Sequence, residues 1–180
     1  MVEIRGRRYE SVRFGPFPIL CMRHIGDYKL ASVTWQKLLG VAFSKGLRPS
    51  SMQIGVVYDD PTITPVDQIR YDACLVTSFE EMEALGLSSA EALAHGIRIE
   101  RLEASLAWRT THIGSYRTLA QAYAGASAPE EFAVLGVHGP APHPPYYEVY
   151  RSDPSSSPPD EQVTDVYLPI SEELAAADAE

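Results

Sequence analysis

The sequence His-Ile-Gly-Asp-Tyr-Lys at residues 24–29 recurs as His-Ile-Gly-Ser-Tyr-Arg at residues 112–117, 88 positions later. Two further blocks recur in the same order: Val57-Tyr58 returns as Val149-Tyr150, and spaced prolines and aspartates from residue 61 to 78 return 93 positions on. Ordered blocks with slowly drifting offsets indicate a duplicated unit. Two related halves tend to pack about a pseudo-two-fold axis, and the groove between them is a natural ligand site.

Composition limits the class of protein. The chain has 180 residues, 45% of them hydrophobic, which is typical of one globular domain. No run approaches the roughly 18 apolar residues of a membrane span, and the first 14 residues lack the apolar core of a secretory signal. We therefore expect a cytoplasmic protein. A net charge of −9 argues against direct nucleic-acid binding and would tolerate a cationic ligand.

No motif indicates a metal, a cofactor or a disulfide. Cys21 and Cys74 form no CxxC pair and lie far apart, so we expect two structural thiols. His138 and His143 lack the convergent ligands that a metal site needs. The nucleophile elbow, the phosphate-binding loop and the dinucleotide fingerprint are all missing.

Each half of the chain reads as strand, helix, strand, strand, after a polar lead at residues 1–11. In the first half, the expected strands are residues 19–24, 53–58 and 70–78, with a helix from an Asp27 cap to about residue 45. In the second half, they are residues 97–112, 146–150 and 164–170, with a shorter helix at 116–124 capped by Ser115. This predicts one α+β domain over residues 1–180. Its antiparallel sheet and helices form two repeats, about 12–78 and 97–171, joined by a connector at 79–96.

The two halves differ at Glu148, which the sequence alignment places opposite Val56. Strand alternation puts Glu148 on one face with Tyr146 and Tyr150, and the apolar Val56 suggests that this face points inward. A buried carboxylate is costly unless it is paired or protonated. Two alternatives stay open. Glu148 could instead face solvent or pair with an arginine such as Arg23 or Arg109. The tyrosines could be ordinary core residues with no contact to a ligand. The second difference between the halves is Tyr167, which aligns with Cys74 of the first half.

These residues resemble the gyrase-inhibitor-like (GyrI-like) small-molecule-binding family, which includes the effector-binding domains of AraC-type and MerR-type regulators. The resemblance covers about residues 17–171 and rests on an ordered set of weak motifs, at residues 24–28, 58–61, 70–72, 147–150, 153–154 and 165–170. It implies two modules that share a ligand cleft. It also implies that Glu148 is the family's buried ligand-binding glutamate and that Tyr167 falls where aromatic cleft residues occur. The family's Trp-containing segment after the second helix is missing here.

The preferred hypothesis is a stand-alone protein that binds amphipathic, aromatic, cationic compounds, with Glu148 neutralising the charge. The aromatic wall candidates are Trp35, Phe43, Tyr58, Trp108, Tyr146, Tyr150 and Tyr167. The resemblance also implies an enzymatic alternative, hydrolysis of strained electrophilic rings in DNA-alkylating compounds. Glu148 would then act as general acid or base. A third is inhibition of DNA gyrase. A separate regulator as partner, the oligomeric state and the ligand's identity stay open.

Overall fold

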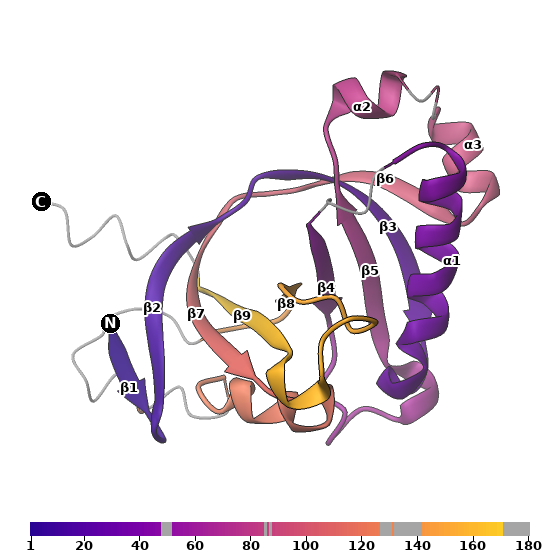
Figure 1. Cartoon of the computed structure of the whole chain (residues 1–180). Helices are drawn as coiled ribbons and strands as arrows, with labels where there is room; N and C mark the ends of the chain where they lie inside the picture. Colours follow the sequence, from indigo (N-terminus) through magenta and orange to yellow (C-terminus); the bar gives the residue numbers. More distant parts are fainter. Residues whose placement is uncertain (48–51, 85, 87, 127–130, 132–141, 171–180) are drawn as a thin grey trace, which may run out of the picture. The chain divides into compact units, whose positions relative to one another are not determined.

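The computed structural model describes residues 1–47, 52–84, 86, 88–126, 131 and 142–170, and the chain divides into two compact units (Figure 1). Unit 1 comprises Met1–Gly15 and Ala104–Glu180, and unit 2 comprises Pro16–Glu103. Each unit combines antiparallel strands with helices, as the expected α+β class requires. His138 and residues 171–180 lie outside the described residues.

Unit 2 is a four-stranded antiparallel sheet with one long helix. The strand order is β4 (Gln53–Val57), β5 (Arg70–Val76), β3 (Phe17–Ile25) and β6 (Ile97–Leu102). Helix α1 (Ala31–Ser44) lies along β3 and β5 (Figure 1). Its buried residues Ala31, Thr34, Leu38 and Ala42 recur every three or four positions and form the stripe that faces the sheet.

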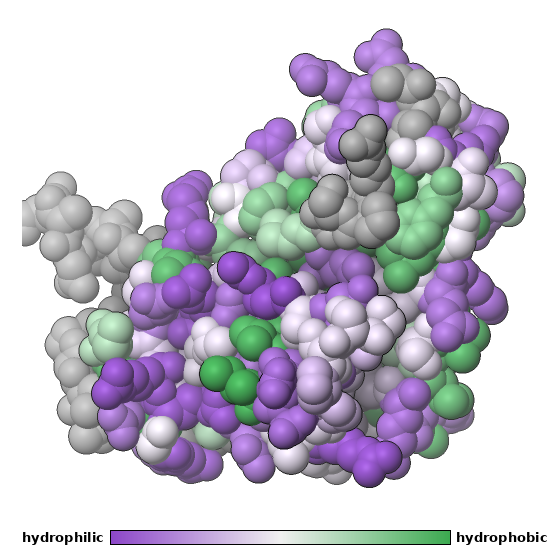
Figure 2. All heavy atoms as spheres, viewed as in Figure 1, coloured by the Kyte–Doolittle hydropathy of each residue, from purple (hydrophilic) through white to green (hydrophobic). Residues whose placement is uncertain are grey.

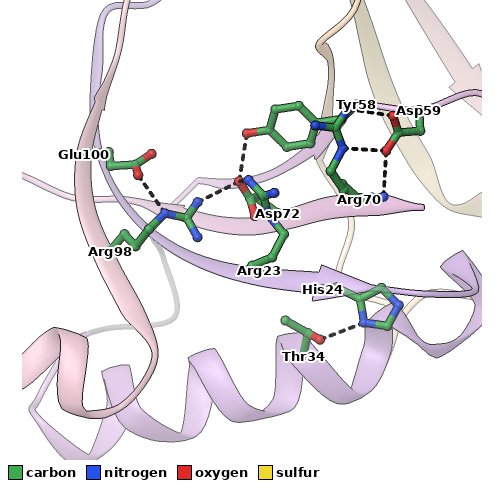
Figure 3. Close-up of polar contacts among 9 residues, drawn as sticks. All are labelled: Arg23, His24, Thr34, Tyr58, Asp59, Arg70, Asp72, Arg98 and Glu100. Atoms are coloured by element: carbon green, nitrogen blue, oxygen red, sulfur yellow. Dashed lines mark hydrogen bonds and ion pairs between the residues drawn. The ribbon is translucent and has the colours of Figure 1, made fainter. Parts of the chain in front are cut away.

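Short helices complete unit 2. They are η1 (Tyr28–Leu30), η2 (Val66–Gln68), α2 (Phe79–Ala84) and α3 (Ser89–Ala94). A capping box of Ser88 and Glu91 begins α3, because the two side chains satisfy backbone N–H groups that the first turn leaves without partners. His24 shares a 3.0 Å hydrogen bond with Thr34, which ties β3 to α1 (Figure 3).

Unit 1 is a five-stranded antiparallel sheet covered on one face by a 3-10 helix, η3 (Tyr116–Tyr123). The strand order is β1 (Val2–Ile4), β2 (Arg7–Phe14), β7 (Ser105–Ile113), β9 (Val163–Ile170) and β8 (Tyr146–Tyr150). A further 3-10 turn, η4, spans Pro159–Glu161. The core of this unit contains Ile4, Tyr9, Trp108, Leu119, Ala122, Val166, Leu168 and Ile170.

The expectation of a polar lead at residues 1–11 was wrong, because β1 and β2 form a hairpin there. Arg5 and Gly6 form its two-residue turn, and both have positive φ, 50° and 74°, the conformation that suits the twist of a tight hairpin. Tyr9 is fully buried in the core, while charged residues occupy the positions around it. Because most residues of β2 are polar or charged and only two are buried, the sequence pattern did not indicate a strand there.

The same local hydrogen bonds recur in the two units. The Asp27 carboxylate accepts from the backbone N–H of Lys29 at 3.0 Å, as the Ser115 hydroxyl does from Arg117 at 3.2 Å. Ser115 therefore caps η3 as expected, whereas Asp27 caps the short helix η1 and the N-cap of α1 is Leu30, which makes no side-chain cap hydrogen bond. Later in each unit, Asp60 accepts from the N–H of Thr62 at 2.8 Å, and Asp153 accepts from Ser155 at the same distance.

The register of the strands corrects one detail of the sequence alignment. Val56 on β4 lies opposite Asp72, whereas Val149 on β8 lies opposite Asp165, which follows Asp72 by 93 positions. Val149 therefore corresponds to Val56, and Glu148 corresponds to the glycine that precedes Val56. The repeated Val-Tyr dipeptide suggested an alignment that is one residue out of register, which would exchange the two faces of the strand.

The fold brings the two cysteines together, although they are distant in the sequence. Cys21 and Cys74 are far apart along the chain, but the antiparallel pairing of β3 and β5 sets them directly opposite one another. Both are free thiols, and both are buried. Sequence spacing alone could not show this, because the contact depends on the register of two strands.

Most of the face of the molecule seen in Figure 2 is hydrophilic, with hydrophobic residues in scattered groups. Across the described ranges of the chain, no helix combines the length and the apolar character needed to cross a membrane. Within those ranges, His, Cys, Asp and Glu side chains do not gather in groups of three or more that could hold a metal ion.

Candidate functional site

A buried carboxylate, that of Glu148, lies at the centre of the candidate site. Glu148 belongs to β8, lies opposite Val166 on β9, and is 8% exposed. The hydroxyl of Tyr123 donates to Oε1 at 2.5 Å, and the hydroxyl of Tyr150 donates to Oε2 at 2.5 Å. Each carboxylate oxygen therefore has one phenolic donor. Glu148 is buried as expected, although the expectation used an alignment with Val56 that the strand register does not support.

Neither arginine considered as a partner for Glu148 pairs with it. Arg23 binds Asp72 in unit 2, and Arg109 forms an ion pair with Glu10 across β2 and β7. Within the described part of the chain, no lysine, arginine or histidine forms an ion pair with Glu148. Its only hydrogen-bond donors there are neutral phenols.

The electrostatic consequence is a carboxyl group that holds its proton strongly. Burial raises the pKa of Glu148, and this effect outweighs the hydrogen bonds from Tyr123 and Tyr150, which act to lower it. A buried carboxylate needs a compensating charge or a proton. The site therefore favours the protonated form of Glu148 more than an exposed glutamate would.

Aromatic rings line the surroundings of this carboxyl group. The ring of Tyr116 meets the ring of Tyr150 edge to face at 5.6 Å, and the rings of Tyr123 and Tyr146 are also 5.6 Å apart. Burial, followed by the charge of Glu148, raises the pKa of Tyr116. These four tyrosines provide ring faces that can attract a cation.

The position of η3 is fixed by a hydrogen-bonded anchor from β2. The fully buried hydroxyl of Tyr9 donates to the carbonyl of Ala122 at 3.1 Å and accepts from the N–H of Gly125 at 2.9 Å. These two backbone groups flank Tyr123 in the chain. Tyr9 thus holds the end of the helix that delivers one of the two donors to Glu148.

One polar atom on this face lacks a partner. Thr164 on β9 lies directly opposite Tyr150, on the same face of the sheet as Glu148. Its side chain is fully buried, and its Oγ1 has no hydrogen-bond partner among the described residues. Buried hydroxyls are nearly always hydrogen-bonded, so this atom keeps an unused hydrogen-bonding capacity within the described residues.

The structure brings some of the expected site residues together with Glu148. Tyr146 and Tyr150 share its strand face, and Tyr146 packs on the core cluster that contains Trp108. Tyr167 lies on the opposite face, because its neighbour Val166 is the residue paired with Glu148. There the ring of Tyr167 contacts that of Phe14 at 4.2 Å. A ligand role for Tyr167 stays a prediction.

The other three expected wall residues belong to unit 2 and do not gather at one point within it. Trp35 on α1 donates to the hydroxyl of Tyr71 at 2.9 Å, on the helix-covered face. Phe43, also on α1, is 43% exposed. Tyr58 donates to Asp72 at 2.8 Å, on the face of the sheet opposite to Tyr71.

Asp72 in unit 2 is also a buried carboxylate, and Figure 3 shows its polar partners, which differ from those of Glu148. Arg23 binds it with two nitrogens, at 2.5 and 3.0 Å, and Arg98 adds a third contact at 2.8 Å. Burial acts to raise the pKa of Asp72, but the hydrogen bonds from Arg23 and Tyr58 and the charge of Arg98 hold it below its usual range. Asp72 is therefore an ionised, structurally paired group.

Sequence reasoning missed two residues of the site, Tyr116 and Tyr123. Both lie in the segment expected to be the second helix, at residues 116–124. Because Glu148 was expected to be buried, it needed hydroxyl donors. A search for such donors in the helix expected to cover its strand would have found Tyr123. The hydrogen bond between Tyr123 and Glu148 could be recognised only from the structure, because the two residues are 25 positions apart in the sequence.

The sequence matches a known family over most of its length. Residues 8–171 match the GyrI-like small molecule binding domain. The chain belongs to the GyrI-like family. This confirms the resemblance seen in the sequence. No match is found among curated proteins.

Solved structures agree with this assignment at the level of the fold of the GyrI-like domain. A hydrolase from Listeria innocua gives a TM-score of 0.61 at 16% identity, covering 92% of both chains. The EcmrR C-terminal domain gives 0.63 at 15% identity, covering 92% of this chain and 98% of its own. SAV2435 bound to tetraphenylphosphonium gives 0.56 at 11% identity, covering 91% and 94%. Identities this low show a common fold alone.

Proposed function

We propose that this GyrI-like domain binds amphipathic aromatic cations, with the carboxylate of Glu148 as the counter-charge. One observation carries the proposal: Glu148 is buried with two phenolic donors, and no described residue supplies it with a positive charge. Asp72 shows how this chain treats a buried carboxylate that serves structure alone, because two arginines bind it. A carboxylate that binds a cationic ligand must instead have no arginine or lysine of the protein already paired with it.

Binding would exchange a proton for the ligand. In the free protein, burial favours the protonated form of Glu148. An aromatic cation seated against the carboxyl group would favour ionisation and release the proton. Each tyrosine face in contact with the cation would add roughly 0.5–2 kcal/mol. The hydroxyl of Thr164 is a further group that a polar substituent of the ligand could engage.

Access to Glu148 would require a side chain to move. Only 8% of Glu148 is exposed, whereas Tyr116 is 39% exposed and lies over Tyr150. We therefore assign Tyr116 as the outermost ring of the site. Its displacement would open a path to Tyr150 and then to the carboxylate.

The ligand class is supported by one neighbour of the same fold. SAV2435 is seen bound to tetraphenylphosphonium, which combines four aromatic rings with a permanent positive charge. The same compound is therefore a suitable first probe for this protein. It cannot lose its charge with pH, so any pH dependence of its affinity reports on the protein.

A pair of titrations tests the proposal. Tetraphenylphosphonium and the neutral, similarly shaped triphenylphosphine oxide are titrated into the wild-type protein, Glu148→Gln and the control Glu103→Gln, whose carboxylate is exposed. We expect Glu148→Gln to lose about tenfold or more in affinity for the cation, with little change for the neutral compound. Equal affinity of wild type and Glu148→Gln for the cation would remove the proposed role.

A second candidate function is hydrolysis at the same carboxyl group. Its support is the raised pKa of Glu148, which suits a general acid, together with a neighbour of the same fold described as a hydrolase. The substrates expected from the sequence are strained electrophilic rings in DNA-alkylating compounds. Incubation with a cyclopropane-bearing alkylator decides the matter, since turnover no faster than in buffer excludes that class.

Several finer expectations stay predictions. They include the packing of two repeats about a pseudo-two-fold axis with a central cleft, and the cytoplasmic location. DNA gyrase and a separate regulator also stay predicted partners. A pull-down with the full chain that recovers no topoisomerase would count against the first of these partners.

A further inference from the structure

The two cysteines of the chain form a cross-strand pair in unit 2. Cys21 on β3 and Cys74 on β5 are directly opposite in the register, and their exposed fractions are 1% and 0%. Both strands are interior, since β3 also pairs with β6 and β5 also pairs with β4. Directly opposite residues of an antiparallel pair project from the same face of the sheet.

Backbone hydrogen bonds at both ends of this strand pair determine which kind of position the cysteines occupy. The N–H of Gly26 donates to the carbonyl of Ile69 at 2.9 Å, and the N–H of Thr77 donates to the carbonyl of Pro18 at 3.1 Å. Each bond joins directly opposite residues, and hydrogen-bonded and non-hydrogen-bonded pairs alternate along an antiparallel ladder. Counted from either end, the cysteines fall on a non-hydrogen-bonded pair.

This position has the spacing that a disulfide needs. In a non-hydrogen-bonded pair the Cα atoms are about 4.5 Å apart and the side chains are closest. Disulfides bridge Cα atoms roughly 4.4–6.8 Å apart. The thiols already interact: burial raises the pKa of Cys74, and a hydrogen bond with Cys21 adds to that rise.

We propose that Cys21 and Cys74 are a modification site, at which a hydroperoxide forms a reversible disulfide between β3 and β5. One thiolate attacks a peroxide oxygen, the O–O bond breaks, and an alcohol or water leaves with the second oxygen. The resulting sulfenic acid is attacked by the other thiol, the S–O bond breaks, and water leaves. Two thiols and one hydroperoxide thus give one disulfide, one alcohol and one water.

The burial of the two sulfurs sets the rate of disulfide formation, and the neighbouring residues determine its structural effect. Both sulfurs are buried and the Cys74 thiol resists deprotonation, so oxidation waits for local opening of the sheet and is slow. Asp72 and Arg23 are each two residues from a cysteine on the same face. The bond would therefore fix the two strands that carry the Asp72 ion pairs in Figure 3.

The test compares the same two thiols in the folded and the unfolded protein. The full chain is equilibrated in a glutathione redox buffer, with and without urea, for long enough to reach equilibrium from both the reduced and the oxidised side. Acid-quenched samples are digested, and the peptide that joins Cys21 to Cys74 is quantified by mass spectrometry. We expect folding to raise the disulfide-to-dithiol ratio at least tenfold, and the oxidised protein to melt at a higher temperature.

Three results of the redox equilibration and the thermal melts would overturn the proposal. They are an unchanged or lower ratio in the folded protein, a bond between two chains in place of an internal one, and a lower melting temperature after oxidation. Cys21→Ser and Cys74→Ser are matched controls, because each leaves one thiol and neither can form the internal bond. A final arm treats folded wild type with hydrogen peroxide. There we expect the internal disulfide to form faster as urea is raised below the unfolding transition, whereas sulfinic acid without any disulfide would also contradict the proposal.

Discussion

Glu148 and Asp72 are both buried carboxylates on antiparallel strands, yet Asp72 is bound by two arginines and Glu148 by two tyrosines. The consequence is opposite protonation behaviour, because the pKa of Asp72 is lowered and that of Glu148 is raised. One carboxylate is neutralised within the fold. The other has no cationic partner among the described residues, and in the proposed function a bound cation would supply one.

The first prediction concerns the pH dependence of cation binding. Below the raised pKa of Glu148, a cation must displace a proton, so the affinity for tetraphenylphosphonium rises about tenfold per pH unit. Above that pKa the carboxyl group is already ionised and the affinity is constant. Calorimetry over a pH series checks this, and in buffers of different ionisation enthalpy it also measures the released proton. Glu148→Gln should show a flat profile.

The second prediction concerns stability in the absence of ligand. The folded-state pKa of Glu148 is raised, so its favourable contribution is fully present below the unfolded-state pKa and is lost as pH rises through the folded-state value. Glutamine does not titrate. The melting temperature of Glu148→Gln minus that of wild type should therefore increase with pH, as thermal melts can show. A difference that is constant or falls with pH contradicts the raised pKa.

The third prediction concerns the Asp72 cluster. Asp72→Asn removes the counter-charge of Arg23 and leaves Arg98 paired with Glu100 alone. It should cost about 1.5–3 kcal/mol of unfolding free energy, because charge-assisted hydrogen bonds to a buried carboxylate are lost. The matched control is Glu103→Gln, which removes an exposed pair with Arg101 and should cost less than about 1 kcal/mol. Urea denaturation measures both. Similar losses for the two variants would mean that Asp72 does not organise the cluster.

The fourth prediction concerns the anchor of η3. Tyr9→Phe removes the hydroxyl that joins Ala122 and Gly125, so it should cost about 1–3 kcal/mol of stability. It should also weaken cation binding, because the neighbouring Tyr123 loses its support. Tyr116→Phe serves as control, since it removes a phenolic hydroxyl but keeps the ring, and should leave stability nearly unchanged. Wild-type affinity in Tyr9→Phe would show that the anchor does not support the site.

Local sequence signals predicted much of the fold. The strand at residues 146–150 appears with those bounds, and α1 ends within one residue of the expected position. The caps at Asp27 and Ser115 accept backbone hydrogen bonds as expected. These features depend on side-chain alternation and on short-range hydrogen bonds, which the sequence displays directly.

Features that depend on strand register were beyond the sequence. The identity of the Val-Tyr dipeptides favoured one alignment of Glu148, and the pairing of β8 with β9 overturned it. The contact of Cys21 with Cys74 has the same origin, because no local pattern reveals which strands are neighbours. Alternation correctly placed Glu148 on one face with Tyr146 and Tyr150. The inference that this face points inward used the overturned alignment with Val56, and alternation could not name Tyr123 as the donor from the covering helix.

The central claim is that the carboxylate of Glu148 provides the counter-charge for a bound cation. The NMR signal of the Glu148 carboxyl carbon tests this claim most directly. The protein is labelled with 13C at the glutamate side-chain carboxyl, and the Glu148 signal is assigned by its loss in Glu148→Gln. The account predicts a protonated Glu148 signal in free protein at a pH where the exposed glutamates are ionised, and its shift to the carboxylate position as tetraphenylphosphonium is added. A Glu148 signal that stays unmoved at saturating ligand would contradict it.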